Sequence, residues 1–266
     1  MSRRNVYLTL ASLVLAVMLL ATQCPPAAAP TPTTAPPTAI PKLKITVATD
    51  ATWPPFEYVD ETSKEIVGFD IDLMKAIAQE VDLEVEFVNV AWDPLLAGMA
   101  AGQYDAAISA MTITEDRKKQ FDFSDPYYNA GQLIVVRAEQ TGIEKPADLA
   151  GHVCGAQIGT TGAMEIEKIT GATLKTYDTI DLAYMDLVNG QIDAVVADNP
   201  LAIGYVNLHK PKLKAVGKPF TEEYYGIAVR KGAPEILERI NKGLKIVLGR
   251  GIIKQLEDKW LSKPAE

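Results

Sequence analysis

A short pattern occurs twice in this chain, and it constrains the fold more than any other feature. Residues 102–108 read GQYDAAI, and residues 190–196 read GQIDAVV. Each copy follows a run with helical spacing and leads into an apolar stretch, which predicts a helix end, a turn and a buried strand at both places. A chance repeat is the alternative. Because both copies have the same helix-to-strand context, we expect two sheets, one in each of two lobes.

The segments before the first copy alternate between strand and helix patterns. Apolar residues in the second segment recur at helical spacing, with Asp70 as a candidate cap. In chain order the expected elements are a strand at 44–50, a helix at 68–81, a strand at 84–88 and a helix at about 93–101. This order predicts an α/β fold with a mostly parallel sheet.

The ends of the two repeated strands are the expected ligand-binding positions. Open α/β sheets bind ligands at the carboxyl ends of their strands. Ser109 and Ala110 follow the first repeated strand, and Ala197 and Asp198 end the second. We therefore expect these two strand ends to face each other across a cleft.

A second, weaker repeat concerns two tyrosine pairs, each followed by an apolar strand pattern that ends in arginine. The pairs are YY at 127–128 with LIVVR at 133–137, and YY at 224–225 with IAVR at 227–230. We expect the two strands to lie where the chain crosses between lobes and to form a hinge. The first lobe would then comprise residues 42–130 plus 228–266, and the second lobe residues 131–227.

The beginning of the chain has the pattern of an export signal followed by a spacer. Positively charged residues precede an apolar run, Val6 to Ala21, which is short for a membrane span and typical of a secretory signal. Residues 25–41 are almost entirely proline, alanine and threonine, which favours an extended tether. Cys24 resembles the lipid-attachment cysteine of bacterial lipoproteins, although Gln23 stands where that family has a small residue. We expect a signal at 1–24 and an exported, periplasmic or extracellular protein anchored by a lipidated Cys24.

Composition excludes several classes of function. The net charge is −8 and no basic run is present, which argues against nucleic-acid binding. Cys24 and Cys154 lie in very different contexts, so neither a disulfide framework nor a zinc site is expected. We interpret His152 and Cys154 as structural, and we expect no metal and no cofactor.

Residues 105–128 contain the chemistry needed to hold a carboxylate. The apolar run Ala106–Ile108 leads into small and hydroxyl residues, among them Ser109 and Thr112, and Arg117 follows. Short neutral donors beside a planar guanidinium can bind a carboxylate through two parallel hydrogen bonds. The alternative is a strand, a turn and a surface arginine.

Six motifs in combination resemble a known family. In order they are TDATWPPFEY, GFDIDL, SAMTITEDR, FDFSDPYY, GTTG and ADNP, between residues 49 and 200, and the resemblance as a whole covers residues 44–260. They resemble the bacterial extracytoplasmic solute-binding proteins for polar amino acids that feed ABC importers. The resemblance implies a two-lobe periplasmic-binding-protein type II fold with a two-strand hinge. It also implies a monomer that captures a free L-amino acid and delivers it to a membrane permease and its ATPase.

The resemblance also implies roles for the groups that hold the backbone of the ligand. Arg117 would take the α-carboxylate, with Thr112 beside it. Thr161, at the start of a helix, would direct free amides at the same carboxylate. Asp198 would accept the α-ammonium group, helped by the carbonyl of Ser109.

Other positions would contact the side chain of the ligand. Asp50 would meet its polar or cationic end, and Trp53 and Trp92 would flank its stem, which favours arginine or lysine, then glutamine. Met111 is placed in the same site, and Ala110 departs from the serine or glycine common there. Alone, each aspartate has the alternative of a turn former or helix cap, and each tryptophan that of ordinary packing.

Two other functions are alternatives. The same fold hosts a cyclohexadienyl or arogenate dehydratase, which needs a general acid over the leaving group. An amino-acid-sensing module of a signalling system would need an output domain, and only LSKPAE follows Trp260. We expect a binding protein and not an enzyme.

Overall fold

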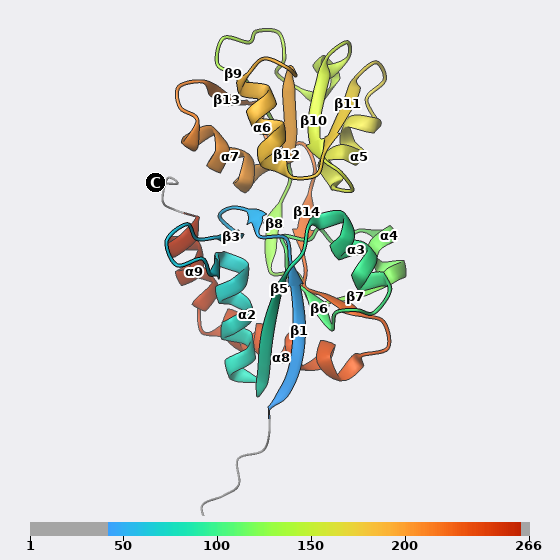
Figure 1. Cartoon of the computed structure of the whole chain (residues 1–266), viewed down its shortest axis with the longest axis vertical. Coiled ribbons are helices and arrows are strands. Elements are labelled where there is room, and N and C mark those ends of the chain that lie inside the picture. Colours follow the sequence, from blue (N-terminus) through green and yellow to red (C-terminus); the bar gives the residue numbers. More distant parts are fainter. Residues whose placement is uncertain (1–41, 262–266) are drawn as a thin grey trace, which may run out of the picture. The chain divides into compact units, whose positions relative to one another are not determined.

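The computed structural model describes residues 42–261. The expected signal, the tether and Cys24 lie outside the described residues. Within the described part, two five-stranded sheets each form the centre of a lobe (Figure 1). None of the described helices is long and apolar enough to span a membrane.

The first lobe is built on a mixed sheet with the order β5-β1-β6-β15-β7. Strand β1 pairs in parallel with β5 and β6, whereas β15 runs antiparallel to both β6 and β7. The strands are β1 (Leu43–Thr49), β5 (Leu83–Asn89), β6 (Ala106–Ala107), β7 (Phe121–Phe123) and β15 (Ala228–Arg230). The expectation of a mostly parallel sheet is thus correct only for the half that contains β1.

The second lobe repeats this arrangement with the order β11-β10-β12-β9-β13. Strand β10 pairs in parallel with β11 and β12, and β9 runs antiparallel to β12 and β13. The strands are β9 (Gln132–Arg137), β10 (Val153–Gln157), β11 (Thr173–Tyr177), β12 (Ala194–Asp198) and β13 (Leu213–Val216). The repeated sequence pattern leads into β6 in one lobe and β12 in the other, as expected.

An antiparallel ribbon of two strands lies between the sheets (Figure 1). It consists of β8 (Tyr128–Ala130) and β14 (Glu223–Tyr225). The expectation that the LIVVR and IAVR stretches would form the crossing was wrong, because they are β9 and β15 and lie inside the sheets. The ribbon instead contains Tyr128 of the first tyrosine pair and both tyrosines of the second. The lobe boundaries and the hinge role remain predictions.

Helices cover the faces of both sheets. In the first lobe they are α2 (Phe69–Glu80), α3 (Trp92–Ala100), α4 (Glu115–Gln120), α8 (Pro234–Gly249) and α9 (Ile252–Trp260). In the second lobe they are α5 (Thr161–Glu167), α6 (Ile180–Val188), α7 (Asn199–Leu208) and a 3₁₀ helix, η1 (Pro146–Leu149). Beside α2 lies a small sheet of β2 (Thr52–Trp53), β3 (Glu57–Val59) and β4 (Ile66–Val67).

An aromatic cluster packs around the ribbon. The ring of Phe56 lies 5.3 Å from those of Tyr128 and Tyr225 and 5.6 Å from that of Phe69, each edge to face. Tyr127 stacks on Phe69. Edge-to-face contacts are favourable because the ring edge is positive and the ring face negative. Three of the four tyrosines of the weaker repeat, Tyr127, Tyr128 and Tyr225, therefore pack together beside the crossing, whereas Tyr224 is exposed.

The start of α2 differs from the sequence expectation. Asp70 does not cap the helix: the cap position is Gly68, and no side chain caps it. Asp70 is instead fully buried. The loop before the helix closes tightly on it, because the N–H of Phe69 donates to Pro55 and that of Asp70 donates to Phe56. Gly68 allows this approach with a φ of 138°.

Substituting Gly68 tests this close approach. A Cβ atom there would lie 2.1 Å from the carbonyl oxygen of Phe56 in a backbone conformation that side chains disfavour. We expect Gly68→Ala to lower the free energy of unfolding by about 2–5 kcal/mol, measured by urea denaturation. Gly249→Ala is the matched control, since nothing lies within 4 Å of its Cβ position. Equal stabilities of the two variants would contradict this packing.

Candidate functional site

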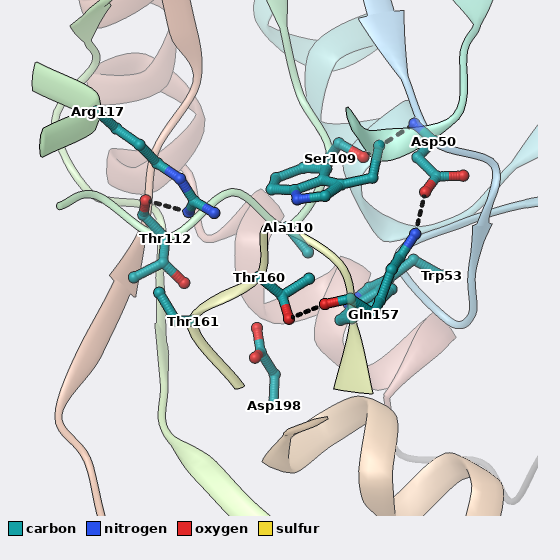
Figure 2. A pocket seen from close by; sticks show the side chains of 11 residues that line it. Asp50, Trp53, Ser109, Ala110, Thr112, Arg117, Gln157, Thr160, Thr161 and Asp198 are labelled. Carbon is teal, nitrogen blue, oxygen red and sulfur yellow. Dashed lines mark hydrogen bonds between the residues drawn. The ribbon is translucent and has the colours of Figure 1, made fainter. Parts of the chain in front are cut away.

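A pocket lies where the strands of the two sheets end (Figure 2). It contains about 310 Å³ of space free of atoms, part of it open to solvent. Its walls come from the ends of β1, β6, β10 and β12, from β2, from the first residues of α3 and α5, and from α4. The lining residues are Asp50, Trp53, Trp92, Ser109, Ala110, Thr112, Arg117, Gln157, Thr160, Thr161 and Asp198.

The structure brings together all but one of the predicted site residues. Met111 is the exception: it is fully buried in an apolar cluster with Trp92 and Leu95 and does not line the pocket. Gln157 and Thr160 line the pocket and were not predicted.

Arg117 is a buried cation in this pocket, with an exposed fraction of only 6%. Its Nη1 donates to the carbonyl oxygen of Thr112 at 2.8 Å, and its Nη2 donates to that of Gly159, in the other lobe, at 3.2 Å. Among the described residues, no carboxylate forms an ion pair with it. Burial lowers the pKa of Arg117 to about 10, while Asp198 and Glu223 oppose that shift. The guanidinium is therefore charged at neutral pH.

Two threonines beside Arg117 are joined by one carboxylate. The hydroxyls of Thr112 and Thr161 both donate to Oε2 of Glu223, each at 2.8 Å. Glu223 lies on β14, so it links a residue of each lobe through the crossing ribbon. Thr161 is the first residue of α5, capped by the side chain of Thr160, and its N–H has no intrahelical acceptor.

Asp198 ends β12 in the opposite wall. The side chain of Gln132 donates to its Oδ1, and the hydroxyl of Tyr225 donates to its Oδ2. Burial, and next the negative charge of Glu223, raise the pKa of Asp198 to about 6, against the two hydrogen bonds and Arg117, which lower it. At pH 7 the carboxyl group is mostly ionised and has no cationic partner among the described side chains.

A second acidic group, Asp50, faces the pocket from the end of β1. Its Oδ1 accepts a hydrogen bond from the hydroxyl of Thr52 at 2.8 Å. Its Oδ2 accepts one from Nε2 of Gln157, in the other lobe, also at 2.8 Å (Figure 2). Its N–H donates to the hydroxyl of Ser109 at 2.9 Å. Burial raises the pKa of Asp50, and the hydrogen bond from Gln157 opposes the shift.

The tryptophans supply apolar walls. Trp53 and Trp92 are 8% and 6% exposed, and the guanidinium carbon of Arg117 lies 5.1 Å from the centroid of Trp92. Both indole N–H groups, and Oε1 of Gln157, lack hydrogen-bond partners within the described part of the chain. Buried polar groups without partners cost free energy, so a polar ligand that reaches them would be stabilised.

The remaining candidates lie elsewhere. Cys154 is fully buried in the core of the second lobe, and burial raises its pKa to about 12. His152 contacts Asp193, with 3.3 Å between Nδ1 and Oδ2. Neither residue lines the pocket. Over residues 42–261, no group of three or more His, Cys, Asp or Glu side chains is arranged to hold a metal ion.

Comparison with known proteins identifies the family. The sequence pattern of the bacterial extracellular solute-binding proteins, family 3, matches residues 45–263. The chain belongs to this family. A curated relative, the "putative ABC transporter arginine-binding protein 2" of Escherichia coli K12, is 36% identical over 226 residues, covering 82% of this chain and 91% of the relative.

Two solved structures of similar fold carry the comparison further. One is "an ancestral arginine-binding protein bound to arginine", with 42% identity, a TM-score of 0.79, and coverage of 83% of this chain and 99% of that one. The other is "the ancestral amino acid-binding protein AncCDT-1, a precursor of cyclohexadienyl dehydratase", with 37% identity, a TM-score of 0.76, and coverage of 82% and 95%. These similarities confirm the two-lobe fold of this solute-binding protein.

Sequence reasoning missed the polar residues that hold the pocket side chains in place. Gln157 ends β10 just before the GTTG turn, the same strand-end position that pointed to Asp198, and this signal could have found it. Glu223 and Gln132 carry no such signal, because each lies in or beside the crossing ribbon, and its contact with the pocket depends on how the lobes meet.

Asp198 gives this solute-binding protein a predicted pH dependence. Its folded pKa of about 6 is above the usual 3.8, so between these values the folded state binds more protons than the unfolded state. Stability from this group is present below about pH 4 and is lost as the pH rises through 6. In denaturant titrations without ligand, we expect the free energy of unfolding of wild type to fall by up to about 3 kcal/mol, relative to that of Asp198→Asn, as the pH rises from 4 to 7.

The control is Asp60→Asn. Hydrogen bonds from Ser63 lower the pKa of Asp60 below its usual 3.8, so above about pH 5 this carboxyl is ionised in both the folded and the unfolded state. The difference in unfolding free energy between wild type and Asp60→Asn should therefore stay nearly constant between pH 5 and 8. A constant difference between wild type and Asp198→Asn from pH 4 to 8 would contradict the prediction.

Proposed function

We propose that this chain is the substrate-binding component of an amino-acid ABC importer and that it captures a polar or basic L-amino acid, arginine or lysine first and then glutamine. The observation that carries the proposal is the charge of the pocket. One buried cation, Arg117, and two carboxylates, Asp50 and Asp198, line the same cavity. A ligand with one carboxylate and two cationic groups complements them.

The geometry suggests one orientation for such a ligand. Its α-carboxylate would meet the guanidinium of Arg117 and the backbone amides of Thr112 and Thr161. Its α-ammonium would meet Asp198 and the carbonyl of Ser109. These groups belong to both lobes and surround a single cavity.

The side chain of the ligand would then extend toward Asp50 and Gln157. The carboxylate of Asp50 and the unpartnered Oε1 of Gln157 are acceptors suited to a guanidinium or an ammonium group. Trp53 and Trp92 would enclose the aliphatic stem, whose apolar surface suits aromatic faces. Arginine would satisfy more of these groups than lysine, because it offers more donors.

Binding would be coupled to closure of the lobes. A ligand shifts the balance between open and closed forms only by its differential affinity for them, so contacts to both walls are what favour the closed form. The ribbon of β8 and β14 is the proposed hinge. The closed form would dock on a membrane permease that works with an ATPase, and the protein would act as an exported monomer.

The relatives support this proposal more than the dehydratase alternative. The Escherichia coli relative and the ancestral structure are both named for arginine binding. The structure named as a precursor of the dehydratase is itself called an amino acid-binding protein. We infer that the chain is not an enzyme, and incubation with prephenate or arogenate should give no turnover.

The decisive experiment is isothermal titration calorimetry with the common L-amino acids. We expect arginine to bind most tightly to residues 42–266, followed by lysine and glutamine, because the pocket has a net charge of −1 from the three charged residues that line it. Tightest binding by glutamate or aspartate, or no binding by any amino acid, would contradict the proposal.

The same titration with Arg117→Ala tests the orientation. Removing the guanidinium would leave the ligand carboxylate buried without its partner, which costs about 2–5 kcal/mol and weakens affinity by roughly 30-fold to several thousand-fold. Arg250→Ala removes an exposed arginine, paired with Glu80, and should bind like wild type. Unchanged arginine affinity in Arg117→Ala would contradict the assignment.

A further inference from the structure

Two carboxyl side chains lie together beneath the pocket without lining it. Glu57, on β3, and Asp70, on α2, are both fully buried, with exposed fractions of 0%. Each carboxyl is near enough to the other to shift its pKa. Since two ionised carboxylates offer only acceptors, a hydrogen bond between them requires a proton on one of them.

Each carboxyl also holds a residue at the end of β6. Oε1 of Glu57 accepts a hydrogen bond from the hydroxyl of Ser109 at 3.1 Å. Oδ2 of Asp70 accepts one from the N–H of Ala110 at 2.7 Å and one from the hydroxyl of Tyr127 at 2.8 Å. The other two oxygens, Glu57 Oε2 and Asp70 Oδ1, have no donor among the remaining described groups. They are the atoms that a shared proton between the two side chains would join.

Among the described residues, no lysine or arginine forms a hydrogen bond or an ion pair with either carboxyl of the pair. Asp50, after β1, acts on Glu57, and the ionisable neighbours from the ribbon are Tyr127 and Tyr225. No lysine or arginine is among the groups that act on either carboxyl. Burial raises the pKa of Glu57 well above its usual value and that of Asp70 to about 6. Two negative charges in this site would be strongly unfavourable.

The hydrogen bond to Ala110 fixes the direction of one peptide group. Ala110 has a φ of 43°, a left-handed conformation that is uncommon for alanine. The peptide between Ser109 and Ala110 is trans, so its carbonyl points away from its N–H. Because the N–H points at Asp70, the carbonyl of Ser109 points to the other side. No donor to that carbonyl is found within residues 42–261.

We propose that Glu57 and Asp70 share a single proton at neutral pH, carried by Glu57, and that this pair is the positioning group that turns the Ser109 carbonyl toward the pocket. Asp70 stays ionised and accepts from Ala110 and Tyr127, while protonated Glu57 donates to Asp70 and accepts from Ser109. The proton removes one of two buried charges and supplies the missing donor. The role of the carbonyl in holding a ligand ammonium rests on the proposed function, whereas the shared proton does not.

The first test compares wild type with Glu57→Gln without ligand. The amide of Gln can donate to Asp70 and accept from Ser109, so the variant keeps the geometry but cannot lose a proton. The raised pKa of Glu57 makes the folded wild type bind one more proton than the unfolded chain above about pH 4.5, so wild type loses stability relative to the variant as the pH rises. We expect the melting temperature of wild type to fall relative to that of the variant by about 5 °C or more between pH 5 and 8. Parallel plots of melting temperature against pH for wild type and Glu57→Gln would overturn the proposal.

A direct measurement covers the case in which the variant does not fold. Wild type would be labelled with ¹³C at the glutamate and aspartate carboxyl carbons and studied by NMR at pH 7. The Glu57 carboxyl carbon should have the chemical shift of a protonated acid, and the Asp70 carboxyl carbon should have that of an ionised carboxylate. Ionised signals from both groups would overturn the shared proton.

The positioning role is tested by hydrogen exchange of the Ala110 amide. We expect slow exchange in wild type, in Glu57→Gln and in Tyr127→Phe, which removes only the other donor to Asp70. In Asp70→Asn, the exchange should become at least about tenfold faster, because the charged acceptor is lost. Unchanged protection in Asp70→Asn would overturn the positioning role.

Arginine titrations then separate this inference from the proposed function. If wild type binds arginine, Glu57→Gln should stay within about threefold of wild type at pH 7, and Glu57→Leu should bind at least about tenfold more weakly, because the donor to Asp70 is lost. Equal affinities of Glu57→Leu and wild type would count against the positioning role. If wild type binds no amino acid, the proposed function fails, and the stability and exchange measurements still decide the pair.

Discussion

A guanidinium buried in the pocket without a carboxylate partner is the constraint on which the rest of this structure depends. Within residues 42–261, the guanidinium of Arg117 is hydrogen-bonded only to neutral carbonyls, one from each lobe. Burying an unpaired charge is costly, and proteins tolerate this cost mainly where the charge has a function. Because the hydrogen bond to Gly159 reaches the other lobe, the position of this charge depends on the contact between the two lobes.

The opposite walls complement this charge without cancelling it. Asp198 and Asp50 are each held by neutral donors and not by cations: Asp198 by Gln132 and Tyr225, and Asp50 by Thr52 and Gln157. Neutral donors fix the direction of a carboxylate and leave its charge available. Beneath the pocket, the buried Glu57 and Asp70 side chains likewise accept hydrogen bonds from neutral donors. The proposed shared proton removes one of their two negative charges, as a counter-ion would. The site is thus preorganised by hydrogen bonds and keeps its charges for a ligand.

The sequence predicted the features that follow from local patterns. The repeated GQxDA pattern gave the two sheets, because a helix end, a turn and a buried strand are encoded within a few residues. Strand ends then pointed to Ser109 and Asp198, and the hydroxyl residues followed by Arg117 pointed to a carboxylate site. The sequence could not show Met111 turning into the core, because that depends on which face of the chain packs against α3. It also misplaced Asp70, since a helix cap and a buried acceptor look alike until the neighbouring loop is seen.

The central claim is that a zwitterion is held from both lobes, and a crystal structure of residues 42–266 with bound arginine would test it most directly. The account predicts the ligand carboxylate within about 3 Å of the guanidinium nitrogens of Arg117, and the α-ammonium at a similar distance from Asp198. It also predicts the ligand guanidinium beside Asp50 and Gln157. A ligand bound in the reverse orientation, or outside this pocket, would contradict the account.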